Sequence, residues 1–256
     1  MIDWTYSPSR TPVEKINRRL TQWRAAAPVV SRPEKLIVSF TFDDFPKSAL
    51  NGADIIETFG GKAGFYACTQ FLGRTSPMGE MYDTQTLREL TDREHEIGAH
   101  SHSHLDCAKV TPEAASQDME DCVRRLQDLG VNGPISSMAY PYGETTFSIK
   151  QSMTSMFDIG RGILPGQNVG RIDRMQLRAY QLNDHPLTVE RAFNALNAAI
   201  ANGSSWLIFF SHDVDRDHTK YGVHPDTIRG LCHKAVDAGA VLAAPYAAAQ
   251  MCGVIS

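Results

Sequence analysis

Short apolar runs alternate with longer amphipathic segments along most of this 256-residue chain. The apolar runs predict strands over residues 36–42, 63–68, 97–100, 136–142, 176–182, 206–211 and 240–243. The amphipathic segments predict helices over about 12–27, 48–59, 84–93, 112–129, 187–202 and 225–238. Thr11-Pro12 and Thr111-Pro112 support two of the helix starts, because each places a hydroxyl N-cap before a proline at the first helical position.

The alternation of strands and helices predicts the fold class. It is typical of β–α units around a parallel sheet. The number of units fits a closed or nearly closed barrel better than an open doubly wound sheet, which stays the alternative. No Gly-x-Gly-x-x-Gly follows a predicted strand, and this disfavours a dinucleotide site. We expect one domain over residues 34–256, with residues 1–33 as an N-terminal helical extension packed on it.

Composition and charge exclude several classes of function. The formal net charge is −4 and the charged fraction is 21%, so no basic face for nucleic acid is expected. No apolar run approaches the ~20 residues of a membrane helix, and no signal peptide is visible at the start of the sequence. The five cysteines form no CxxC pair, which favours free thiols in a reducing compartment. We therefore expect a cytoplasmic protein that binds neither nucleic acid nor membrane.

Titratable residues follow several of the predicted strands, where a parallel barrel places its active site. Asp43 and Asp44 end the first strand, His100 and His104 follow the 97–100 strand, and His212 follows the 206–211 strand. Two adjacent carboxylates suit one metal ligand and one general base, and two histidines with one carboxylate suit a divalent metal.

Each of these features also has a structural explanation when it is taken alone. The aspartates could cap a helix, the two histidines could lie on a solvated turn, and His212 could be a core histidine. His102 is expected to point away from its two neighbours. The alternating Asp213, Asp215 and Asp217 lack the glycine and glutamate of a calcium loop and are expected to form a solvated loop.

Four motifs together resemble the polysaccharide deacetylases, the NodB-homology enzymes of carbohydrate esterase family 4. They are Thr41-Phe42-Asp43-Asp44, His100-Ser101-His102-Ser103-His104, Tyr140-Pro141-Tyr142-Gly143 and Ile208-Phe209-Phe210-Ser211-His212. The resemblance covers about residues 36–246. It implies a distorted (β/α)7-type barrel and a divalent metal, most often zinc, with cobalt, nickel or manganese as the other expectations.

The resemblance also implies residue roles. Asp44, His100 and His104 would bind the metal, Asp43 would be the general base and His212 the general acid. The backbone N–H of Tyr142 would contribute to an oxyanion hole. Ile208 and Phe210 would line the pocket for the acetyl methyl group.

Three positions depart from the family pattern. Phe45 stands where a glycine is usual, and we expect it to alter the rim of the pocket. Ala139 stands where an arginine often pairs with the base. Arg161 and Arg178 are candidates to replace that arginine, and we favour Arg178. No tryptophan accompanies the carboxylate that should orient His212, and Asp184 is our candidate for that carboxylate.

The sequence thus favours a metal-dependent hydrolase that removes an N-linked acetyl group from an amino sugar in a glycan or oligosaccharide. An alternative keeps the chemistry but acts on another C–N bond, such as a formamide, a cyclic amide or another small amide. A third hypothesis, a non-catalytic carbohydrate-binding protein on a decayed scaffold, is disfavoured because all five core residues are present.

Overall fold

The computed structural model describes residues 2, 4–9 and 11–256. The helices of the described residues are α1 Pro12–Trp23, α2 Leu50–Thr58, α3 Thr84–Asp92, α4 Pro112–Asp128, α5 Phe147–Met153, α6 Pro186–Asn202, α7 Pro225–Asp237 and α8 Pro245–Met251, with short 3₁₀ turns η1 Lys47–Ala49, η2 Thr69–Phe71, η3 Cys107–Lys109 and η4 Pro141–Gly143. The strands are β1 Pro28–Ser31, β2 Leu36–Asp43, β3 Gly64–Ala67, β4 Thr75–Ser76, β5 Gly79–Glu80, β6 Glu96–Ala99, β7 Ser137–Ala139, β8 Ile159–Arg161, β9 Gly170–Asp173, β10 Tyr180–Gln181, β11 Ser205–Ser211 and β12 Val241–Leu242.

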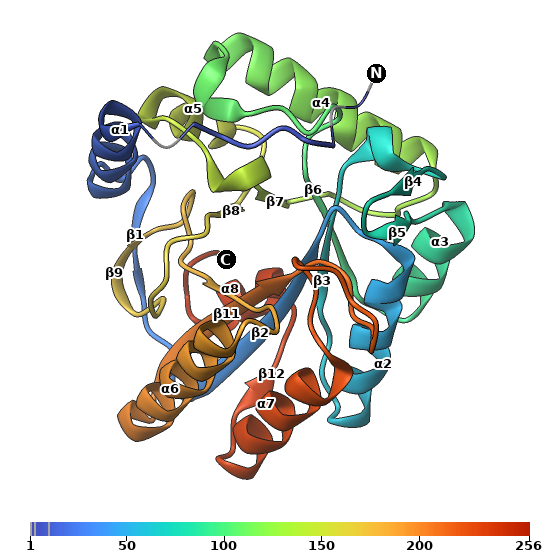
Figure 1. The fold of residues 1–256 in the computed structure, drawn as a ribbon. Coiled ribbons are helices and arrows are strands. Elements are labelled where there is room, and N and C mark those ends of the chain that lie inside the picture. Colours follow the sequence, from blue (N-terminus) through green and yellow to red (C-terminus); the bar gives the residue numbers. More distant parts are fainter. Residues whose placement is uncertain (1, 3, 10) are drawn as a thin grey trace.

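A curled parallel sheet forms the centre of the molecule (Figure 1). Its strand order is β10-β11-β2-β3-β6-β7-β8, and β12 pairs with the first half of β2. The chain around residues 177–181 joins the two edges, because Leu177 bridges Arg161 of β8 while β10 pairs with β11. The structure confirms the predicted distorted (β/α)7-type barrel, with most helices around the outside of the sheet.

Strand periodicity divides the core into two layers and fixes which side chains face the barrel interior. Along β2, Leu36, Val38, Phe40 and Phe42 pack toward the outer helices. Ile37 packs in the interior with Trp206, Ile208 and Phe210 of β11. The same alternation turns Asp43, the last residue of β2, toward the mouth of the barrel.

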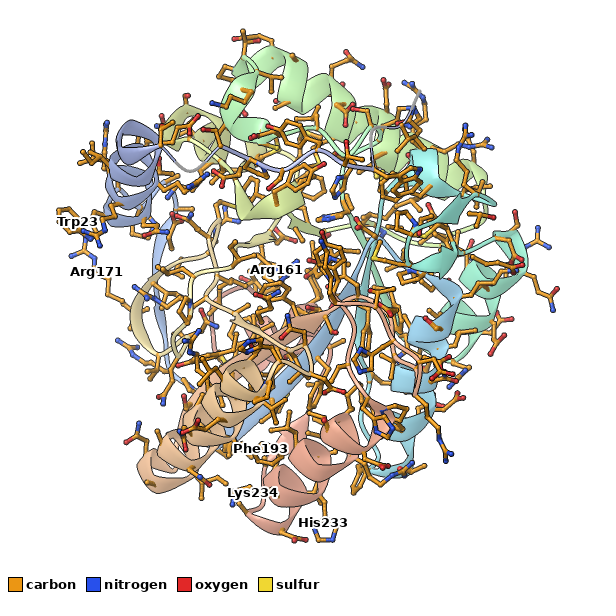
Figure 2. All side chains as sticks on the ribbon, viewed as in Figure 1. Trp23, Arg161, Arg171, Phe193, His233 and Lys234 are labelled. Atoms are coloured by element: carbon orange, nitrogen blue, oxygen red, sulfur yellow. The ribbon has the colours of Figure 1, made fainter. Side chains whose placement is uncertain are left out.

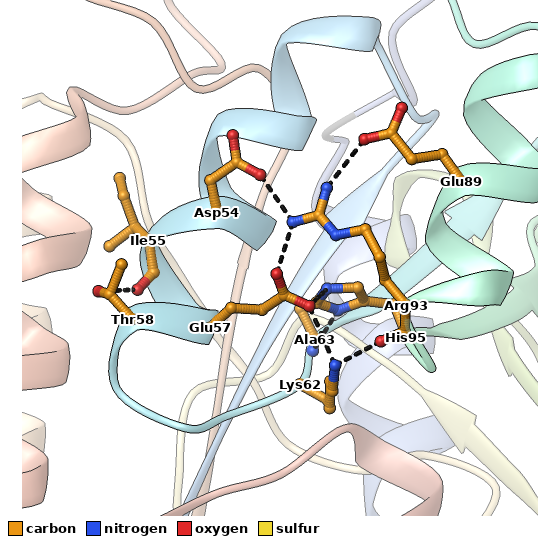
Figure 3. Close-up of polar contacts among 9 residues, drawn as sticks. All are labelled: Asp54, Ile55, Glu57, Thr58, Lys62, Ala63, Glu89, Arg93 and His95. Carbon is orange, nitrogen blue, oxygen red and sulfur yellow. Dashed lines mark hydrogen bonds and ion pairs between the residues drawn. The ribbon is translucent and has the colours of Figure 1, made fainter.

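A charged cluster lies between α2 and the end of α3, where β3 and β6 begin (Figure 3). Arg93 binds Glu57 (2.8 Å) and Asp54 (2.6 Å), so it joins α3 to α2. The Ala63 backbone N–H donates to Nδ1 of the buried His95 (3.0 Å), whose Nε2 lies 3.2 Å from Glu57. His95 is therefore held neutral, with its proton on Nε2, and burial lowers its pKa to about 4.

The N-terminal extension is fastened to the barrel by a strand and a buried lysine. β1 pairs antiparallel with β9. Lys150 Nζ, which is fully buried, donates to the carbonyls of Thr21 and Arg24 and to Asp173 (2.7–2.8 Å). None of the helices in the described part of the chain is both long and apolar enough to cross a membrane.

Several predicted boundaries are wrong. The first helix ends at Trp23 rather than near Ala27, because the chain turns into β1. The predicted strand 176–182 is reduced to a bridge at Leu177 and to β10, and the predicted strand 136–142 is reduced to β7. The sequence analysis missed the helices α5 and α8 and the strands β1, β4, β5, β8 and β9. The division of the chain at residue 33 stays a prediction.

Candidate active site

The predicted residues meet in one cleft at the mouth of the barrel. The cleft has a volume of about 1360 Å³. Its lining includes Asp43 and Asp44 after β2, His100 and His104 after β6, Tyr142 in η4, and Phe210 and His212 at the end of β11. This is larger than the 300–1,000 Å³ typical of small-molecule sites, so it accommodates a ligand of more than one ring.

Asp44, His100 and His104 form a cluster with the geometry of a metal site. Their ligand atoms lie within 4.8 Å of one another. Asp44 Oδ1 lies 2.9 Å from His104 Nε2 and 3.4 Å from His100 Nε2. Atoms that each lie 2.0–2.2 Å from one tetrahedral zinc ion would be about 3.4 Å apart, so these separations fit a shared divalent cation.

Two further observations support that fit. His100 Nδ1 lies 2.9 Å from the Ala139 carbonyl oxygen, which only accepts, so Nδ1 carries the proton and Nε2 keeps a free lone pair. Burial lowers the pKa of His100 to about 4, which favours the neutral form that metals bind. Asp44 Oδ1 is buried and receives no well-directed hydrogen bond. Burial alone would raise the pKa of Asp44, but interactions with the three histidines His104, His100 and His212 hold it below its usual value.

Asp43 is held by Arg161, and the expectation that Arg178 pairs with it is wrong. Arg161 Nη2 donates to both Asp43 oxygens (2.6 and 2.5 Å), and its guanidinium lies 4.8 Å from the ring centre of Phe210. Arg161 is 1% exposed and lies in the middle of the barrel (Figure 2). Arg178 is exposed and points to the carbonyl of Pro165 instead.

His212 lies beside the cluster, and the expectation that Asp184 orients it is also wrong. His212 Nε2 is 3.9 Å from Asp44 Oδ2, while its Nδ1 is buried with no hydrogen-bond partner among the described residues. Asp184 instead accepts from the His224 backbone N–H (2.7 Å) and lies 2.8 Å from His218 Nε2. Asp184 therefore fixes the loop after β11 rather than the histidine of the cleft.

The loop that contains Asp213, Asp215 and Asp217 is only partly solvated. Asp215 and Asp217 are exposed, as expected. Asp213 is buried and accepts from the backbone N–H and hydroxyl of Thr219 (2.6 and 2.8 Å). It closes a tight turn, because its carboxylate takes the place of a backbone acceptor.

The residues expected to line the pocket are only partly in it. Tyr142 lines the cleft, and its ring packs edge-on against His104 at 4.5 Å. Phe210 lines the cleft as well. Ile208 does not, because it lies two residues earlier on the same face of β11 and is fully buried one layer deeper in the barrel. His102 bonds to the Thr69 hydroxyl (2.8 Å), which confirms that it points away from the cluster.

Phe45 does not form the rim of the cleft, contrary to expectation. Its ring is fully buried, stacks on Tyr82 at 4.8 Å and packs against Phe65. Its φ of 63° belongs to the left-handed region. That conformation favours glycine, so a bulky residue at this position has an unfavourable backbone conformation.

Backbone strain is concentrated at this end of the barrel. Six described residues other than glycine have positive φ, and all except Glu94 lie in the loops at the mouth: Asp44, Phe45, Ser101, His104 and Tyr142. Non-glycine residues in this region cost of order 1–3 kcal/mol each and are concentrated at functional sites. The strained backbone therefore marks the same loops as the titratable residues.

Sequence reasoning missed one wall of the cleft. Residues 2 and 4–9 of the N-terminal segment line it, and Figure 1 shows this segment running across the mouth of the barrel. In the sequence, Trp4 and Tyr6 could have indicated this wall, because two large aromatic residues in a polar terminal stretch usually pack against another part of the protein.

Comparison of the sequence with protein families gives one match. The family model described as "Polysaccharide deacetylase" matches residues 31–156. The curated proteins include no match to the sequence.

Among solved structures, the fold is similar to that of a family 4 acetyl xylan esterase from Clostridium thermocellum, with 22% identity and a TM-score of 0.58 over 86% of this chain and 93% of that one. It is similar to the peptidoglycan deacetylase PdaC from Bacillus subtilis, with 15% identity and a TM-score of 0.55 over 86% and 92%. A mutant of a CE4 family pseudoenzyme shares the fold too, with 12% identity and a TM-score of 0.58 over 88% and 71%. The fold alone therefore does not distinguish an enzyme from a pseudoenzyme, and the residues of the cleft carry that distinction. The family match and the shared fold together confirm the resemblance to the polysaccharide deacetylases that the four motifs indicated.

Proposed function

We propose that this protein is a metal-dependent hydrolase that removes an N-linked acetyl group from an amino sugar in a glycan or oligosaccharide. The observation that carries the proposal is the joint placement in one cleft of the Asp44–His100–His104 cluster, the Asp43–Arg161 pair and His212. A divalent ion held by the cluster supplies a Lewis acid that polarises the amide carbonyl and lowers the pKa of water. Zinc suits this donor set best, and cobalt, nickel and manganese are the alternatives.

The chain's own residues then perform the proton transfers. Asp43 accepts a proton from the attacking water, and Arg161 holds its carboxylate in position. The water oxygen bonds to the amide carbon, and the backbone N–H of Tyr142 donates to the developing oxyanion. The C–N bond then breaks as His212 gives a proton from Nε2 to the leaving amine, and acetate and the free amino sugar result.

The test is acetate release from N-acetylated glycans and oligosaccharides. We expect release that a chelator abolishes and that zinc restores. His100→Ala should lose bound metal and turnover together. His102→Asn is the matched control, because His102 lies in the same loop but bonds to Thr69, and it should keep both. Full turnover by His100→Ala, or no release by protein that holds one metal per chain, would refute the proposal.

A further inference from the structure

The N-terminal segment, residues 2 and 4–9, packs against two loops that flank the candidate metal site. Trp4 contacts Phe71 at a ring-centre distance of 4.4 Å, and Ile2 packs on the same small cluster of Cys68, Phe71 and Met81. Tyr6 contacts the Tyr142 ring at 5.1 Å. The segment therefore spans from the loop after β3 to the turn after β7.

Polar contacts hold the segment at the same place. The Tyr6 hydroxyl donates to Asp106 (2.5 Å), in the loop after β6, and this contact with burial raises the pKa of Tyr6 to about 12. Just behind the segment, α1 is tied to the same rim by Glu14–Lys109 and Arg18–Glu144, each at 2.5 Å.

Both aromatic contacts lead directly to a residue of the metal cluster. Phe71 lies 5.3 Å from the His104 ring, and Tyr142 lies 4.5 Å from it on another side. Trp4 and Tyr6 thus each stand one ring away from His104. A substrate bound at the cluster lies beside this wall.

Other loops and strands complete the lining of the cleft. Among them are Gln181 of β10, Phe210 of β11, and Lys220 and Tyr221 of the loop after β11. Lys220 and Tyr221 are exposed, and the Lys220 ammonium lies 4.8 Å from the Tyr221 ring. These side chains line the cleft together with the N-terminal segment.

An inner unit of a polymer needs room for the chain to leave the cleft in two directions, and here the N-terminal segment occupies one of them. We infer that the protein acts on short N-acetylated saccharides, and that Trp4 and Tyr6 set this limit. This inference rests on the proposed function and names the substrate length for the same site. The aromatic faces of Trp4 and Tyr6 bound the space for the unit next to the acetylated sugar.

The test is kcat/KM for acetate release from N-acetylglucosamine oligomers of one to six units and from the polymer. We expect wild-type kcat/KM to be highest for short oligomers and at least tenfold lower for the hexamer and the polymer. The double variant Trp4→Ala/Tyr6→Ala should raise the ratio of hexamer to dimer at least tenfold. Trp23→Ala is the matched control, because Trp23 lies in the same extension but is 81% exposed outside the cleft (Figure 2), and its ratio should not change.

Thermal unfolding and metal content will show whether the double variant folds. If it does not fold, the wild-type kcat/KM values across the oligomer lengths still test the inference. A wild-type kcat/KM for the hexamer or polymer equal to that for the dimer would overturn the inference and leave the proposed function standing. An unchanged ratio in a folded double variant would also overturn it. No release from any length by metal-loaded protein would refute the proposed function, and this inference with it.

Discussion

Replacing Arg161 by methionine should destabilise the protein strongly, because it leaves the Asp43 carboxylate buried without a cation. Asp43 is 5% exposed and receives two charge-assisted hydrogen bonds from Arg161, at 2.6 and 2.5 Å. Breaking a buried pair by removing one partner typically costs about 3–5 kcal/mol. Methionine preserves much of the side-chain volume beside Phe210, so little of the loss should come from packing.

A second substitution separates the charge effect from the packing effect. Asp43→Asn in the Arg161→Met background removes the unpaired charge, so the double variant should recover much of the lost stability. Arg178→Met is the matched control, because Arg178 is exposed and its guanidinium donates to the backbone carbonyl of Pro165 rather than to a carboxylate. Its unfolding free energy should stay within about 0.5 kcal/mol of wild type.

Urea unfolding in the presence of a chelator measures these differences without a contribution from metal binding. For an m-value of about 3 kcal/mol/M, the loss in Arg161→Met moves the midpoint down by at least about 1 M. A midpoint shift equal to that of Arg178→Met would refute the reasoning. A double variant less stable than Arg161→Met alone would refute it as well.

Two further predictions concern other buried groups. The pKa of His95 is lowered to about 4 while the unfolded value is near 6.5, so between these values the unfolded chain binds a proton that the folded protein does not. The contribution of His95 to the free energy of unfolding should therefore fall by about 3 kcal/mol as pH drops from 7 to 4, and His95→Gln should lose less stability than wild type across that range when unfolding free energies are measured. Phe45→Ala should cost about 3–5 kcal/mol for its buried ring, whereas Phe45→Gly should be the more stable of the two variants by about 1–2 kcal/mol, because glycine adopts the φ of 63° without strain. Thermal unfolding of the two Phe45 variants checks the second prediction, and the reverse order of stability would contradict it.

The parts of the fold that the sequence predicts are those with strong apolar patterns. β2 and β11 are mostly apolar and are buried along their whole length. β8 could not be found in this way, because Ile159-Gly160-Arg161 offers a single large apolar residue. Missing β8 also removed the reason to prefer Arg161 over Arg178.

In the candidate site, too, some residues could be predicted from the sequence and others could not. The residues predicted for the metal cluster, together with Asp43 and His212, lie in short motifs directly after predicted strands. The structure brings these residues together in one cleft. The supporting contacts depend on loop paths that no local pattern records. Asp184 binds His218 rather than His212, and Ile208 lies one layer below the cleft. The N-terminal segment reaches the cleft only through tertiary packing.

The pairing of β2 with β11 also shapes how the chain must assemble. Residues 36–42 pair with residues 205–211, near the other end of the sequence. At about 5–20 residues per second, roughly 10–30 s of synthesis separate the two strands. During that interval the largely apolar edge of β2 that will receive β11 is unpaired, and such an edge is a template for association with other chains. The strand that ends at Asp43 is therefore also an aggregation hazard of the nascent protein. Folding of the barrel is expected to be slow because it depends on this distant contact.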